Sequence, residues 1–333
     1  MDIKFKGKIE SLIAEIKSRY DLRFIDIGLE KGAKFYIFGG VLRDMILDKP
    51  WKEIDVRVFI NEPYPKRDDV MEQILSEAGI NISSKIPFGE SFTVYRFVPP
   101  NSKSKVDIDL SVISKDFSVG PDFTINGLYL DFVTHELIDP HNAIQAIEEK
   151  VIKTALEPIQ QFKNEPWMIF RAVKAACQFD FNIEQKTLQG MKVNASLAEG
   201  MMQSIVDKSM GGMTEWLLGN MLRGLKYNAK KFVDIWNETG ITLIFVKFIA
   251  KNYGSTSNDI KITNPFVLGR HDGFEDNLNI FFSEVSVAVD KENPEKVFRK
   301  ILDLFEIDKP KQFEDFIIDP SKLRFIKNID ILV

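Results

Sequence analysis

The chain has 333 residues, a net charge of −5 at pH 7 and 44% hydrophobic side chains, which is typical of a globular protein of about two domains. This composition excludes a disordered chain, a collagen-like chain and a coiled-coil rod. A single cysteine excludes an intramolecular disulfide, and three histidines argue against a histidine-rich metal site. No apolar run is long enough to span a bilayer and the N-terminus lacks a secretory signal pattern, so we expect a cytoplasmic protein without a membrane partner.

The first half of the chain mixes the residue patterns of helices and strands. Apolar residues recur at helical spacing in three segments, which predicts helices over residues 4–18, 41–47 and 69–78. Short apolar or alternating segments bounded by turn residues predict strands over residues 34–38, 54–60, 91–98, 106–112 and 123–133.

After residue 142 the helical pattern dominates and strand patterns become rare. It predicts helices over residues 142–150, 156–162, 165–179, 184–197, 204–219, 227–239, 278–289 and 295–305. Residues 252–264 are rich in Ser, Thr, Asn and Gly, which predicts a loop. We therefore predict an α+β fold: a head domain over residues 1–150, a helical neck and body over 151–255, and a C-terminal helical region over 256–333.

Two glycines, Gly39 and Gly40, lie between a predicted strand and a predicted helix. Glycine lets the backbone approach a ligand closely, and the free N–H groups at a helix N-terminus bind phosphate. Arg43 would lie one turn into the helix, within reach of the same anion. A tight turn without a ligand is the alternative, and no Gly-Lys-Ser/Thr follows as it would in a Walker loop.

Two predicted strand segments carry paired carboxylates. Glu53 and Asp55 are two residues apart, and so are Asp107 and Asp109. Residues i and i+2 of a strand share a face and lie about 6.6 Å apart. If the two strands are neighbours, the carboxylates converge and need a cation or a proton between them, and Mg²⁺ prefers such oxygen ligands. The alternative is that each pair lies on the solvent face of an edge strand.

In order and spacing, these motifs resemble those of the class II tRNA nucleotidyltransferases, the family of the CCA-adding enzymes and the related bacterial poly(A) polymerases. The family signature Gly-Gly-x-Val-Arg-Asp followed by Asp-x-Asp is similar to residues 38–44 and 53–55 here. The resemblance continues through residues 88–92, 122–127 and 137–140, the predicted helix near 142–152, and Arg171 with its neighbours. It covers roughly residues 30–220.

The resemblance implies a polymerase-β-like head followed by a helical neck and body. It implies a Mg²⁺-dependent, template-independent nucleotidyltransferase, in which an RNA 3′-hydroxyl attacks the α-phosphate of a nucleoside triphosphate and pyrophosphate leaves. Glu53 and Asp55 would ligate the metal. Asp107 or Asp109 would supply the third carboxylate, as a ligand or as a base, and the sequence leaves both open.

The same resemblance implies a nucleotide site. Gly39, Gly40 and Arg43 would hold the triphosphate of ATP or CTP, and Asn126 would contact the sugar. Further nucleotide-binding positions would be Asp122, Glu165 and Arg171, with Glu165 accepting a hydrogen bond from the base. The implied partners are a nucleoside triphosphate and an RNA 3′ end, above all that of tRNA.

Four departures from the family pattern concern the metal and base-reading residues. Glu53 replaces an Asp, and Gly120-Pro121 replaces two arginines. Met168 replaces the Arg that reads the base edge, and it cannot donate those hydrogen bonds. The downstream Ser-x-x-Arg motif has no Arg in residues 204–213. The neighbouring Trp167 could stack on a base or pack in the core.

Charge and these departures support two alternatives. The net negative charge lies in residues 1–150, and no basic track for RNA is evident, although Lys226, Lys230 and Lys231 form a local basic group. A nucleotidyltransferase with a protein or small-molecule acceptor is one alternative. A binding protein that kept the fold and lost turnover is the other, and the retained carboxylates argue against it. The tryptophans at 216 and 236 are expected in the helical core.

Overall fold

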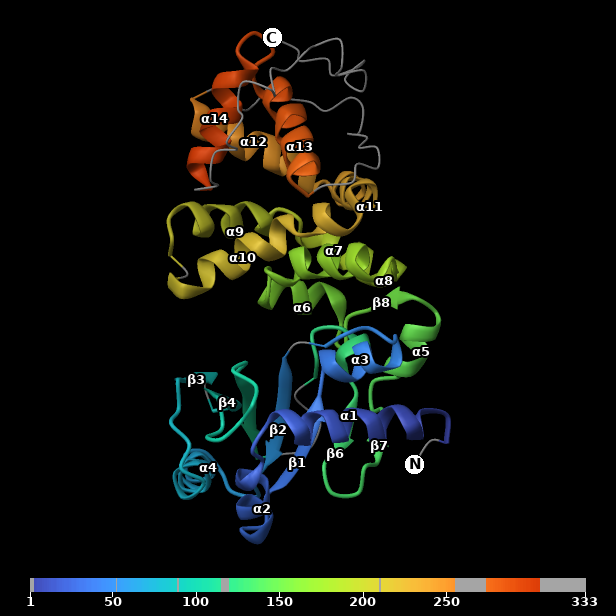
Figure 1. The fold of residues 1–333 in the computed structure, drawn as a ribbon. Helices are drawn as coiled ribbons and strands as arrows, with labels where there is room; N and C mark the ends of the chain where they lie inside the picture. Colours follow the sequence, from blue (N-terminus) through green and yellow to red (C-terminus); the bar gives the residue numbers. More distant parts are fainter. Residues whose placement is uncertain are drawn as a thin grey trace. The chain divides into compact units, whose positions relative to one another are not determined.

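The computed structural model describes residues 3–51, 53–88, 90–114, 120–209, 211–254 and 274–305. The chain divides into two compact units, Met1–Glu149 and Lys150–Val333 (Figure 1). The first combines a sheet with helices and the second is almost entirely helical, which confirms the predicted α+β fold class. None of the described helices is both long enough and apolar enough to cross a membrane.

Unit 1 is built on a seven-stranded mixed sheet with the strand order β3-β4-β5-β2-β1-β6-β7. Its strands are β1 (Lys34–Phe38), β2 (Ile54–Phe59), β3 (Ser84–Phe88), β4 (Phe92–Phe97), β5 (Ile108–Ile113), β6 (Tyr129–Asp131) and β7 (Leu137–Ile138). β2 pairs with β1 in the antiparallel sense and with β5 in the parallel sense. Strands β2 and β5, which carry the predicted carboxylates Asp55 and Asp109, are therefore neighbours in the interior of the sheet.

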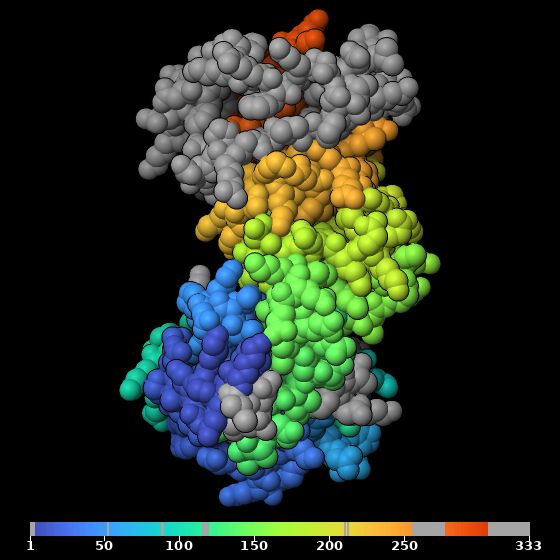
Figure 2. Space-filling view, turned by 90° about the vertical axis from the view of Figure 1, so that its right-hand side faces the viewer, coloured from blue at the N-terminus to red at the C-terminus, as the bar shows by residue number. Residues whose placement is uncertain are grey.

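The helices of unit 1 pack against the sheet and connect its strands. They are η1 (Ile3–Phe5), α1 (Lys6–Arg19), α2 (Arg23–Glu30), α3 (Gly40–Ile46), α4 (Lys66–Glu77), η2 (Thr124–Asn126) and α5 (Ala143–Glu148). The dark blue N-terminal segment forms much of the face of unit 1 drawn in Figure 2. A Cβ at Gly28 of α2 would lie 2.4 Å from the Phe35 ring of β1, so only glycine lets this helix lie so close to the sheet.

One predicted strand of unit 1 is largely wrong. Within residues 123–133 the structure has the 3₁₀ turn η2 followed by the short strand β6. The Asp122 carboxylate explains the turn, because its Oδ1 accepts hydrogen bonds from the Phe123 backbone N–H and from the Asn126 side chain. Helix α2 and strand β3 were not predicted.

Unit 2 consists of helices and one small parallel pair of strands, β8 (Val151–Ile152) and β9 (Asn182–Ile183). Its helical elements are α6 (Pro158–Asn164), α7 (Met168–Phe179), α8 (Gln185–Asn194), α9 (Leu197–Val206), η3 (Gly211–Met213), α10 (Thr214–Leu222), α11 (Gly224–Thr239), α12 (Ile241–Tyr253), α13 (Phe274–Val289) and α14 (Pro294–Leu304). The core gathers around the fully buried Trp236, which contacts the rings of Phe232, Phe245 and Phe281.

Two further predictions for the helical half need correction. The single helix predicted over residues 204–219 is divided between α9, which ends at Val206, and α10, with positive φ angles at Lys208 (+51°) and Gly211 (+54°) between them. Helix α12 was not predicted. Most of the predicted loop at 252–264 lies outside the described residues, so the domain boundary near residue 255 stays a prediction.

Candidate active site

The parallel register of β2 and β5 brings the predicted carboxylates onto adjacent strands. Asp55 and Asp109 are direct partners, and Ile54 pairs with Ile108. Glu53 and Asp107 each lie one residue before the start of their strand. Both strands are interior strands of the sheet, so the alternative of two separate edge strands is wrong.

Arg96 of β4 holds the Asp109 carboxylate. Its Nε donates to Oδ1 at 2.6 Å and its Nη2 donates to Oδ2 at 2.7 Å, a bidentate pair between cross-strand partners. The hydrogen bonds that Arg96 donates to Asp109 raise the pKa of Arg96, and the charges of Asp109, Asp107 and Glu53 raise it further. Arg96 therefore supplies positive charge to this group of carboxylates.

The turn between β1 and α3 places Gly39 against Asp55. Phe38 is the register partner of Asp55, and Gly39 has a φ of +78°, which favours glycine. A Cβ at Gly39 would lie 3.3 Å from Oδ2 of Asp55. The predicted phosphate-binding turn and the predicted metal ligand are therefore in direct contact.

A hydrogen-bonded network beside this turn joins other predicted residues. Nη1 of Arg43 donates to Oδ1 of Asn126 at 2.5 Å, and the Asn126 amide donates to Asp122 at 2.9 Å. Nη2 of Arg43 also lies 2.8 Å from Asp44, and a Cβ at Gly40 would lie 3.3 Å from the same Nη2. The network holds the Arg43 guanidinium beside the glycine turn.

Arg57 is a buried cation on the face of β2 that also carries Asp55. Its Nε donates to Oγ of Ser111 at 3.3 Å, which shows that the side chains of β2 and β5 share this face. Its guanidinium lies 4.1 Å from the centre of the Phe38 ring and donates to the Tyr129 hydroxyl. Burial lowers the pKa of Arg57, while Tyr129 and Asp55 oppose that shift. The alternating residue pattern of β2 places Arg57 on the same face as Asp55, but the sequence alone indicated no functional role for it.

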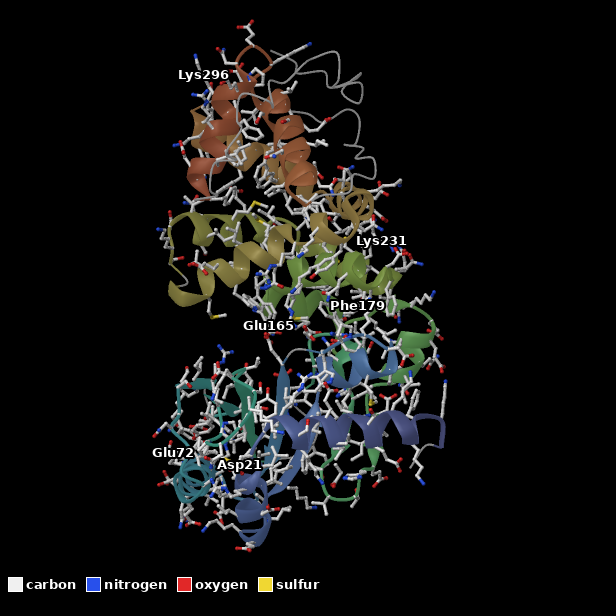
Figure 3. The ribbon with its side chains drawn as sticks, in the orientation of Figure 1. Asp21, Glu72, Glu165, Phe179, Lys231 and Lys296 are labelled. Carbon is white, nitrogen blue, oxygen red and sulfur yellow. The ribbon has the colours of Figure 1, made fainter. Side chains whose placement is uncertain are left out.

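The predicted neck residues belong to unit 2. Glu165 directly follows α6, at the opposite end of α7 from Phe179 (Figure 3). The guanidinium of Arg171, in the first turn of α7, lies over the ring of Trp167. Met168 is fully buried. The roles of Glu165 and Arg171 in nucleotide binding stay predictions.

The acidic residues of unit 1 have the chemistry that Mg²⁺ requires. Carboxylate oxygens are its preferred protein ligands, and Asp55 has Glu53 two residues before it and Asp109 as its register partner on β5. Among the described residues, however, no group of three or more His, Cys, Asp or Glu side chains lies close enough to hold a metal ion. Both Asp109 oxygens accept hydrogen bonds from Arg96.

No protein-family model matches the chain. Among curated proteins, the CCA-adding enzyme of Streptococcus uberis is 26% identical over 178 residues, which are 51% of this chain and 43% of the relative. That of Limosilactobacillus reuteri is 29% identical over 206 residues, 59% of this chain and 49% of the relative. That of Streptococcus thermophilus is 23% identical over 323 residues, 90% of this chain and 76% of the relative. The chain thus spans less than half of the first two relatives.

Solved structures show the same fold. The Thermotoga maritima CCA-adding enzyme complexed with tRNA matches with a TM-score of 0.53 at 17% identity, covering 92% of this chain and 71% of that one. A tRNA-processing enzyme in an apo form matches with a TM-score of 0.52 at 16% identity, covering 97% and 80%. The chain therefore has the same fold as these two enzymes. The predicted resemblance to class II tRNA nucleotidyltransferases is confirmed, and the similar proteins are CCA-adding enzymes.

Proposed function

We propose that this chain is a template-independent nucleotidyltransferase that adds nucleotides from a nucleoside triphosphate to the 3′ end of an RNA, above all tRNA. The contact of Asp55 with the Gly39 turn on one side, and its pairing with Asp109 on the other, is the observation that carries the proposal. It joins a phosphate-binding turn to a metal-ligating strand, as phosphoryl transfer requires. The relatives named CCA-adding enzymes support the RNA acceptor.

In this mechanism Glu53 and Asp55 would hold Mg²⁺, whose charge would stabilise the leaving pyrophosphate. The backbone at Gly39 and Gly40 approaches the triphosphate. The Arg43 guanidinium, positioned by Asn126, neutralises the phosphate oxygens. A carboxylate on β5 or directly before it accepts the proton of the attacking 3′-hydroxyl.

We assign that carboxylate to Asp107, one residue before β5, because Arg96 holds both oxygens of Asp109. Asp107→Asn is expected to lower the rate of nucleotide transfer by about 10²-fold or more, the usual contribution of a general base. Asp109→Asn should cost less than about 10-fold, since it removes a partly exposed ion pair. Single-turnover rates with labelled ATP measure both. The reverse order of the two effects would make Asp109 the third carboxylate.

We infer a relaxed or single-nucleotide preference in place of faithful CCA synthesis. The fully buried Met168 offers no hydrogen bond to a base edge, and apolar contacts discriminate only by about 10–200-fold. A tRNA lacking its CCA end, incubated with CTP and ATP, should therefore receive additions dominated by one nucleotide or by a mixture. Sequencing of the product ends reads the outcome. Complete CCA ends would contradict this inference.

The acceptor assay tests the proposed function as a whole. The purified protein is incubated with Mg²⁺ and each labelled nucleoside triphosphate, with tRNA lacking CCA, total RNA or cell-extract protein as the acceptor. We expect label on RNA, lost when EDTA removes the metal. Absence of label from every acceptor would overturn the proposal in favour of a binding protein.

A protein or small-molecule acceptor is the second candidate, and one observation favours it. Two of the three lysines in the local basic group are ion-paired, because Lys230 pairs with Asp234 and Lys231 pairs with Asp180. Pairing of these two lysines reduces the charge that the group offers to RNA phosphates. Label found only on protein or on a small molecule would establish this candidate.

A further inference from the structure

A surface cluster of aromatic and basic side chains lies where α7 and α10 pack together in unit 2. The rings of Trp167 and Trp216 are 5.4 Å apart and meet edge to face. The Arg171 guanidinium lies 5.5 Å from the Trp167 ring centre and 5.9 Å from that of Trp216. We call these three residues the indole–arginine cluster.

The cluster is not part of the core. Trp216 is 36% exposed, whereas Trp236 is fully buried, so the prediction that both are core residues is wrong for Trp216. Trp167 is half-buried. Both indoles of the cluster therefore leave part of their surface accessible to solvent.

Two more cations lie near the cluster. Lys174, three residues after Arg171 on α7, donates to Oδ1 of Asn220 on α10 at 3.2 Å. Arg223, directly after α10, folds back along that helix, because a Cβ at Gly219 would lie 3.1 Å from its guanidinium.

The spacing of these residues places them together. Positions 167, 171 and 174 on α7, and 216, 220 and 223 on and after α10, recur every three or four residues and therefore share a face of each helix. The acidic Glu215 is one position before Trp216, about 100° around the helix. The face is therefore dominated by indoles and cations.

Arg223 differs in its ion pairing from many basic residues in unit 2. Lys192, Lys230, Lys231, Lys251 and Arg299 each pair with a carboxylate. Arg223 is exposed and makes no ion pair with any residue in the described part of the chain. Its charge is therefore available to an external anion.

We infer that the indole–arginine cluster binds single-stranded RNA, with an unpaired base stacked on Trp216 and with Lys174 and Arg223 near the backbone phosphates. Exposed aromatic rings flanked by basic side chains are the arrangement that binds single strands, since every base has a face that can stack. Arg171 stiffens the platform through its contact with both indoles. The inference rests on the proposed function in that RNA is the acceptor. Because stacking does not depend on base identity, the cluster would bind RNA without reading its bases. This agrees with the fully buried Met168, which offers no hydrogen bond to a base edge.

Fluorescence anisotropy with a labelled single-stranded RNA oligonucleotide tests the inference on the full chain. EDTA is present and nucleotide is omitted, so that catalysis plays no part. Trp216→Ala should weaken binding about 5–100-fold, the usual effect of losing one stacked base, and Trp216→Phe should restore most of it. Arg223→Gln should weaken binding and reduce the slope of log affinity against log salt by about 0.7, the value for one phosphate contact.

Arg299→Gln is the matched control, because it removes the same charge from an ion-paired arginine elsewhere in unit 2 and should change neither affinity nor slope. Unchanged binding by both Trp216→Ala and Arg223→Gln would overturn the inference, as would a duplex RNA that competes as well as the single strand. If Trp216→Ala does not fold, Arg223→Gln decides. Loss of binding in these variants supports the cluster even if the acceptor assay detects no transfer, so the two proposals fail separately.

Discussion

Asp55→Asn is expected to lower nucleotide transfer by on the order of 10³-fold or more, with little change in stability. Removal of a metal-ligating charge from a phosphoryl-transfer site eliminates stabilisation that exists mainly in the transition state. Asn has nearly the same shape, so the contact with the Gly39 turn and the strand pairing are retained. Single-turnover measurement of labelled nucleotide on RNA, beside the thermal midpoint of unfolding, separates chemistry from folding.

Asp26→Asn provides the control for this experiment. Asp26 is an exposed carboxylate on α2, so its change alters the charge of unit 1 by the same amount outside the candidate site. Its transfer rate should match that of the wild type. A metal ligand is expected to cost far more than tenfold. If the transfer rate of Asp55→Asn stays within about tenfold of the wild-type rate, the metal-site assignment is wrong.

Gly39→Ala is expected to lower kcat/KM about 10–100-fold, beyond any loss of stability. The backbone of Gly39, with φ of +78° and ψ of −137°, is strained for alanine, at a cost of about 1–3 kcal/mol. In addition, its Cβ would lie 3.3 Å from Oδ2 of Asp55 and would displace the carboxylate or the turn. Misplacement of catalytic groups by a fraction of an ångström to 1 Å accounts for losses up to about 10²-fold.

Gly32→Ala separates the two effects. Gly32 has nearly the same φ, +80°, but nothing lies within 4 Å of its Cβ position. The variant should therefore lose unfolding free energy because of its positive φ and keep its activity. Denaturant unfolding and steady-state kinetics on both variants provide the comparison. Equal kinetic losses in the two would show that backbone strain, and not the contact with Asp55, explains the effect.

Local patterns in the sequence were sufficient for the central strands and the turn of the candidate site. The apolar segment before Gly39 predicted β1, and the alternation around Asp55 predicted β2, because each strand's residues face alternately into and out of the core. The i, i+2 spacing of acids placed the side chains of Asp107 and Asp109 on one face. Since the motifs followed the order of a known family, the fold class could be predicted as well.

Elements without a strong local pattern were missed or misjudged. The predicted strand over residues 123–133 became η2 and β6, because a side-chain hydrogen bond from Asn126 to Asp122 competes with strand pairing. The helix predicted over 204–219 is interrupted after Val206, where the left-handed backbone of Lys208 (φ +51°) cannot continue a helix. In both places a single local interaction outweighed the periodic pattern.

The sequence by itself determined which chemical groups this protein has and on which strand faces they lie. Only the tertiary structure decided which of them meet. The pairing of Arg96 with Asp109 requires β4 to lie beside β5, and the contact of Arg43 with Asn126 joins residues 83 positions apart in the chain. The indole–arginine cluster likewise requires α7 to pack on α10. Such contacts depend on how distant segments bury their apolar faces together, and short-range periodicity carries no information about that choice.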